Sequence, residues 1–149
     1  MTICGIDPGQ KGGIAFLKGT AIEAVHPMPV LDKKIDVRAL IVMLEIMGPD
    51  LVVIEQQSIR PMQSGAMAIG ANYGRLLACV EALSLPHRII TPAQWNKAAG
   101  IKAGLTGRAK KEASYALCRR TWGAAFDRLG LRPAQDGQYE AALIARFGA

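Results

Sequence analysis

Two acidic residues each end a short, mostly apolar run of residues. Asp7 closes residues 2–6 and is followed at once by Pro8-Gly9, and Glu55 closes residues 51–54. Runs of this length are typical of buried strands and are too short for a helix. A buried carboxylate is unfavourable unless it is paired or bound to a cation. The two acids therefore indicate a cation site, although Asp7 alone could simply cap the Pro8-Gly9 turn.

A second pair of acids opens the last apolar segment of the chain. Asp136 and Glu140 are four residues apart, so they project from the same face of a predicted helix over residues 136–147. Like charges at this spacing are unfavourable by about 0.2–0.5 kcal/mol without a cation. The alternative is that Asp136 caps the helix and Glu140 is a first-turn acid favoured by the helix dipole.

Four carboxylates would make an all-oxygen ligand set, which suits Mg²⁺ or Mn²⁺. Two such ions about 4 Å apart can activate water and stabilise the leaving oxygen of a phosphodiester. The sequence therefore predicts a metal site formed by Asp7, Glu55, Asp136 and Glu140, with two ions per site.

The predicted topology brings the first two acids together. Residues 1–7, 12–17 and 20–26 form an antiparallel meander joined by tight glycine turns. A helix over residues 37–47, capped by Asp36, then crosses over to a strand at residues 51–55. A right-handed crossover makes this fourth strand parallel to the first and able to lie beside it. Asp7 and Glu55 then share one edge of the sheet.

The remaining chain adds one strand and several helices. A helix over residues 64–83 is rich in Gly and Ala, which favours tight docking on the protein's own sheet; the alternatives are a dimer contact or an approach by DNA. A fifth strand at 86–91 precedes a helix that starts with the capping box Thr91–Gln94. A basic loop at 102–107 and a helix at 108–121 follow, and then a segment at 122–134 that is irregular or contains a short helical turn. Lys110 and Lys111 are expected to face solvent.

Composition indicates one globular α/β domain over residues 1–149, half hydrophobic and one fifth charged. No apolar run approaches the roughly 18 residues that cross a bilayer, so we expect a cytoplasmic protein with no membrane partner. Three well-separated cysteines are expected to be reduced core residues.

The charge is concentrated in one segment. Residues 87–132 hold ten Lys and Arg against two acids, a net charge of +8, whereas the rest of the chain carries −2. This asymmetry favours a surface that binds nucleic acid over a basic helix face that is merely solvated. The candidate DNA-binding residues are Lys97, Lys102, Arg108, Lys110 and Lys111.

The order of these motifs resembles one nuclease family. Residues 5–9 (Gly-Ile-Asp-Pro-Gly), the strand end Ile54-Glu55-Gln56, and Asp136 followed by Glu140-Ala141 are similar to RuvC-type Holliday-junction resolvases, especially compact bacteriophage forms. The match runs over essentially the whole chain.

The resemblance implies an RNase H-like fold with a five-stranded mixed sheet, order 3-2-1-4-5, flanked by helices. It implies a homodimer that makes paired nicks in four-way DNA junctions, in the host cytoplasm if the chain is phage-encoded. It also carries over the four acids as metal ligands and places Lys97 and Lys111 near the scissile phosphate, with Lys111 in a catalytic role; each could instead be a solvated lysine.

The sequence departs from the cellular enzymes at two places. Residues 57–60 supply no aromatic after the second acid, and the last acids are spaced Asp-x-x-x-Glu. Both differences bear on junction selectivity, so the sequence is also consistent with cutting of branched DNA more broadly. It leaves open an actin-like nucleotide-binding module, a DNA-binding domain without catalysis, and a nuclease for RNA–DNA hybrids. No P-loop motif is present.

Overall fold

A five-stranded mixed sheet forms the centre of the computed structural model, which describes all 149 residues. Strands β1, β2 and β3 form the predicted antiparallel meander, and β6 and β7 extend the sheet parallel to β1. The order across the sheet is β3-β2-β1-β6-β7. The strand bounds are β1 Thr2–Asp7, β2 Gly13–Lys18, β3 Ala21–Pro27, β6 Leu51–Glu55 and β7 His87–Ile90.

The numbering of this order differs from the predicted 3-2-1-4-5 because the chain contains a small additional hairpin. Strands β4 (Val30–Leu31) and β5 (Lys34–Ile35) form a separate two-stranded sheet within residues predicted to be a loop. The buried Asn72 side chain holds this hairpin, since its Oδ1 accepts a hydrogen bond from the Ile35 amide at 2.9 Å. No local pattern in so short a segment reveals such a partner, which lies 37 residues away in the chain.

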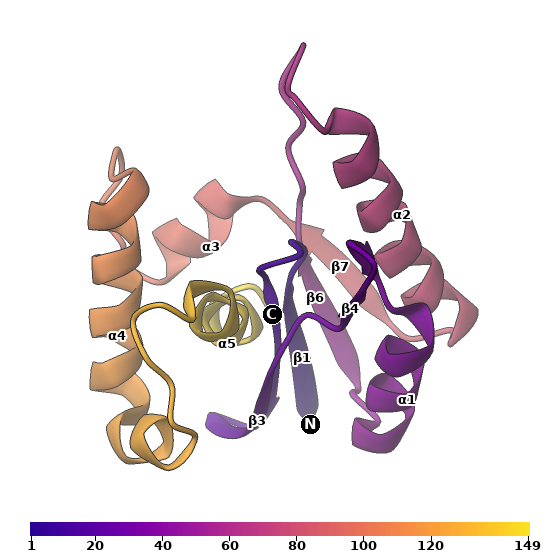
Figure 1. Cartoon of the computed structure of the whole chain (residues 1–149). Helices are drawn as coiled ribbons and strands as arrows, with labels where there is room; N and C mark the ends of the chain where they lie inside the picture. The colour runs from indigo at the N-terminus through magenta and orange to yellow at the C-terminus, as the bar shows by residue number, and fades with distance from the viewer.

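The helices form layers on both faces of the sheet (Figure 1). Helices α1 and α2 lie on one face. Helix α5 lies across the other face, and α4 packs on the outer side of α5 with α3 nearby. The helix bounds are α1 Val37–Met47, α2 Ala66–Ala82, α3 Pro92–Ala98, α4 Gly107–Arg128 and α5 Asp136–Phe147. No helix is both long enough and apolar enough to cross a membrane.

Alternation along the strands divides the core in two. In β1, Cys4 and Ile6 join the cluster under α1 and α2, whereas Ile3 joins the cluster under α4 and α5. Side chains two residues apart share a face of a strand. All three cysteines are free and buried, as predicted.

Local capping explains where two helices begin. The Asp36 carboxylate accepts hydrogen bonds from the amides of Arg38 and Ala39, both at 3.1 Å, and so starts α1 as predicted. The predicted capping box of Thr91 and Gln94 starts α3. These caps satisfy amide groups that have no partner within the helix.

Two helix predictions need correction. Helix α4 continues to Arg128, through residues predicted to be irregular or to contain only a short helical turn. It has a kink at Trp122, whose buried indole donates to the Thr20 carbonyl at 2.8 Å. In α2 the small residues do not dock on the sheet: a Cβ at Gly74 would meet no atom within 4 Å. Tertiary contacts decide both outcomes, since neither follows from local periodicity.

Helix α5 approaches the sheet at backbone contact distance. A Cβ on Gly5 in β1 would overlap the Ala141 carbonyl and the backbone of Ala145, and one on Gly13 would overlap Gln138. Gly12 and Gly137 form a β-bridge at the start of α5. Small residues on both sides therefore set the distance between the helix and the sheet.

This close approach predicts a strong effect of one methyl group. We expect Gly5→Ala to destabilise the fold by about 3 kcal/mol or more, because neither backbone can move aside without disturbing the core. Gly74→Ala, within α2 and unobstructed, should instead stabilise by about 0.5–1 kcal/mol. Denaturant unfolding of both variants measures the difference, and a Gly5→Ala protein as stable as the wild type would contradict the described packing.

Candidate active site

Asp7 and Glu55 lie side by side at the carboxyl ends of neighbouring parallel strands. Ile6 of β1 pairs in register with Ile54 of β6, so the next residue of each strand is an acid. Each acid lies two residues beyond a position that faces α5: a Cβ on Gly5 in β1 would meet Ala141 and Ala145, and Val53 in β6 belongs to the core cluster on that face. Both carboxylates therefore point to the side of the sheet that α5 covers.

Helix α5 brings the second pair of acids to the same edge. The Gly12–Gly137 bridge fixes the first turn of α5 against the β1–β2 turn that follows Asp7. Asp136 is the first residue of the helix, not its N-cap, which is Gln135 and makes no side-chain capping bond. The capping role considered for Asp136 is therefore wrong, and Asp136 and Glu140 instead flank the strand-end acids.

Burial and neighbouring acids disfavour the charged forms of these carboxylates. Burial raises the pKa of Asp7 to about 8, with further contributions from Glu55, Glu140 and Asp136. Burial also raises the pKa of Glu55 and of Glu140. Acids that raise one another's pKa in a partly buried cluster lack enough positive charge, which is the electrostatic condition for binding a cation.

Two lysines at the start of α4 supply part of the missing charge. Lys110 Nζ lies 3.7 Å from Glu140 Oε1, and Lys111 forms an ion pair and hydrogen bond with Asp136, which raises the pKa of Lys111. The prediction that Lys110 faces solvent is wrong, since only 26% of its side chain is exposed. Lys111 remains 55% exposed.

Three polar side chains hold this arrangement, and sequence reasoning had not singled them out. The buried Trp95 donates its indole N–H to Glu55 Oε2 at 2.5 Å. Ser114 Oγ donates to Glu140 Oε1 at 3.3 Å, and Tyr139 Oη donates to the Lys111 carbonyl at 3.2 Å. A tryptophan or serine on an inward helix face is ordinarily a core residue, so only the contact reveals the role.

The other candidate DNA-binding residues lie on the surface beside the acids. Lys97 in α3 and Lys102 in the loop after it are exposed and contact none of the four carboxylates. Arg108 is also exposed and pairs with Glu112 at 2.6 Å.

The carboxylates have the right chemistry for a divalent cation but are not gathered around one point. No three acidic, histidine or cysteine side chains form a group that could hold an ion as they stand. Two of the four acids are instead paired with lysines. The donor set and the unbalanced negative charge fit Mg²⁺ or Mn²⁺ once side chains rotate.

The pKa of Asp7 generates a prediction about pH. Below about pH 4 Asp7 is protonated in both states, and between pH 4 and 8 the folded protein holds this proton more tightly than the unfolded chain does. The stabilisation that this tighter proton binding gives to the folded protein is thus present at acid pH and is lost as the pH rises through about 8. In EDTA, we expect Asp7→Asn to gain stability relative to the wild type across this window, by about 1–3 kcal/mol.

Thermal unfolding from pH 4 to 9 measures this gain, with Asp32→Asn on the exposed β4–β5 hairpin as a control for losing one charge. Added Mg²⁺ should stabilise the wild type more than Asp7→Asn. A constant difference between Asp7→Asn and the wild type at every pH would show that Asp7 is not in a repulsive cluster.

Comparison with solved structures finds a similar fold in several Holliday junction resolvases. RuvC of T. thermophilus in complex with a Holliday junction substrate superposes with a TM-score of 0.69 at 19% identity, covering 97% of this chain and 90% of that one.

One viral structure and one mitochondrial structure are also similar. The fowlpox virus Holliday junction resolvase has a TM-score of 0.61 at 14% identity, covering 97% of this chain and 94% of that one. The yeast mitochondrial Holliday junction resolvase has a TM-score of 0.57 at 12% identity, covering 96% and 76%. The sequence matches no protein-family model and no curated protein. At these identities the likeness establishes the fold.

Proposed function

We propose that the protein is a divalent-metal-dependent endonuclease that cuts four-way or other branched DNA. The observation that carries this proposal is the convergence of Asp7, Glu55, Asp136 and Glu140 on one sheet edge, in mutual repulsion and beside a basic helix. A protein that only bound DNA would gain nothing from acids facing phosphate. The RuvC-type fold supports the same chemistry and substrate class.

The chain's own residues divide the work of this reaction. Asp7, Glu55, Asp136 and Glu140 would hold Mg²⁺ or Mn²⁺, two ions per site, with Trp95 and Ser114 orienting Glu55 and Glu140. When bound, such ions activate water and stabilise the leaving oxygen. Water oxygen bonds to phosphorus and the bond to the 3′ oxygen breaks, leaving 5′-phosphate and 3′-hydroxyl ends. Lys111, next to Asp136, is placed to stabilise charge on the phosphate.

The basic segment supplies the surface for the DNA backbone. Three exposed basic residues lie on or near α3 and the start of α4: Lys97, Lys102 and Arg108. None of them pairs with a carboxylate of the site, and Arg108 pairs with Glu112. Phosphate contacts of this kind set affinity and orientation without reading sequence. We further propose a homodimer, because two sites on one symmetric particle would give paired nicks in a four-way junction.

The test is cleavage of a labelled four-way junction in Mg²⁺, beside linear duplex, fork and RNA–DNA hybrid substrates. We expect paired symmetric nicks in the junction, and Asp7→Asn should lower cleavage more than about 100-fold while leaving junction binding within about twofold. Cleavage of the hybrid alone, or binding without cleavage by the wild type, would overturn the proposal. The mass of the protein–junction complex tests the dimer.

A further prediction concerns the salt dependence of binding. Lys97→Gln removes one exposed charge on α3, so the slope of log affinity against log salt should fall by about 0.9 for one lost phosphate contact. Lys34→Gln, in the separate β4–β5 hairpin, is the matched control and should leave the slope unchanged. Equal slopes for Lys97→Gln and the wild type would place Lys97 outside the DNA contact.

A further inference from the structure

The ammonium group of Lys110 places a positive charge among the acids of the site. Its ammonium lies 3.7 Å from Glu140 Oε1 and 5.1 Å from the centre of the Trp95 ring, whose N–H binds Glu55. Its charge also acts on Asp7, Glu55 and Glu140, lowering the pKa of each against the larger effect of burial. One lysine therefore offsets charge on three of the four acids.

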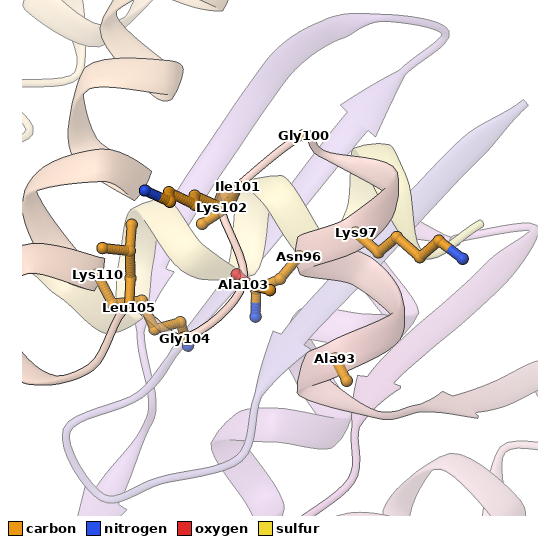
Figure 2. A pocket seen from close by; sticks show the side chains of 10 residues that line it. All are labelled: Ala93, Asn96, Lys97, Gly100, Ile101, Lys102, Ala103, Gly104, Leu105 and Lys110. Atoms are coloured by element: carbon orange, nitrogen blue, oxygen red, sulfur yellow. The ribbon is translucent and has the colours of Figure 1, made fainter.

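The same lysine lines a pocket that opens beside the site. This pocket, of about 580 Å³, lies between α3, the loop after it and the start of α4 (Figure 2). Figure 2 shows Asn96 and Lys110 on opposite sides of the pocket, whereas Lys97 extends away from it. Lys102 also lines it and is exposed. Two lysines that line one open pocket suit an anionic ligand such as a DNA phosphate.

We propose that Lys110 is an exchangeable counter-ion of the carboxylates, which turns into this pocket and binds a DNA phosphate when a divalent cation takes its place. This inference rests on the proposed function. Lys110 lines both sites from a single backbone position, so rotation of its flexible four-carbon side chain suffices. The exchange also explains why the acids are not gathered around one point while Lys110 and Lys111 are paired with them.

Lys111 does not share this geometry. It pairs with Asp136 and lines a different pocket, with Arg108 and Tyr115, on the other side of the helix start. Lys110 alone thus connects the acids with the pocket at α3. A cation at the carboxylates would release Lys110 to bind a DNA phosphate, and DNA bound to Lys110 would leave the carboxylates free for the cation. Cation and DNA should therefore each raise the affinity for the other by the same factor.

The experiment compares junction affinity in EDTA and in Ca²⁺, with the DNA checked to be intact afterwards. For the wild type we expect Ca²⁺ to raise affinity by about tenfold, a usual coupling strength. Lys110→Met should lose most of this Ca²⁺-dependent gain, measured as the ratio of its own affinities in Ca²⁺ and in EDTA. Lys102→Met is the matched control: it should weaken binding by the same factor in both conditions. Equal Ca²⁺ gains in Lys110→Met and Lys102→Met would overturn the exchange.

A second measurement does not depend on DNA. The Ca²⁺ concentration that half-maximally raises the thermal midpoint should be several-fold lower for Lys110→Met than for the wild type, because the competing ammonium is gone. Lys110→Arg keeps the charge and should behave more like the wild type. An unchanged Ca²⁺ requirement in Lys110→Met would refute the counter-ion role. If neither the wild type nor the variants bind or cut the junction, the proposed function fails, and the Ca²⁺ measurement still decides the counter-ion role.

Discussion

The close approach of helix α5 to the β1–β2 hairpin is the constraint on which the site depends. Gly137, Ala141 and Ala145 recur every four residues and form the face of α5 that meets Gly5, Gly12 and Gly13. Asp136 and Glu140 each precede a member of this small-residue face, so the contact that seats the helix also turns both acids toward Asp7. A larger side chain on either side would move the helix outward and separate the two pairs of acids.

Bringing four acids together makes the site electrostatically unfavourable by itself. Burial raises the pKa of Asp7, Glu55 and Glu140, and neighbouring acids raise the pKa of Asp7 and Glu140 further. Helix α4 supplies positive charge through Lys110 and Lys111, and two hydrogen bonds hold the helix in place. Near its start the Lys111 carbonyl accepts a hydrogen bond from Tyr139, and beyond its middle Trp122 is tied to Thr20. A cluster that disfavours its own charge in this way is typical of functional sites.

The two faces of the sheet carry different roles. Helices α1 and α2 cover one core cluster and carry two Lys or Arg residues, whereas α3, α4 and α5 cover the face to which the acids point (Figure 1) and carry eight of the 18. Positive charge therefore lies beside the carboxylates without mixing into them, apart from the two lysines that pair with Glu140 and Asp136. In the proposed nuclease, this separation would let one surface bind the DNA backbone while its edge holds cations.

The place of the fifth main strand in the sheet was implied only by the resemblance to resolvases. The sequence alone determined the order of the other four main strands, the caps of α1 and α3, and the meeting of Asp7 with Glu55. These follow from signals within a few residues and from the handedness of one crossover. Tertiary structure decided what depends on partners far along the chain. The Trp95–Glu55 hydrogen bond spans 40 residues, and the inward turn of Lys110 depends on Glu140. The continuation of α4 and the exposed small residues of α2 were decided in the same way. Local patterns record which face of a helix is apolar, whereas the packing of whole elements decides which polar groups on that face meet.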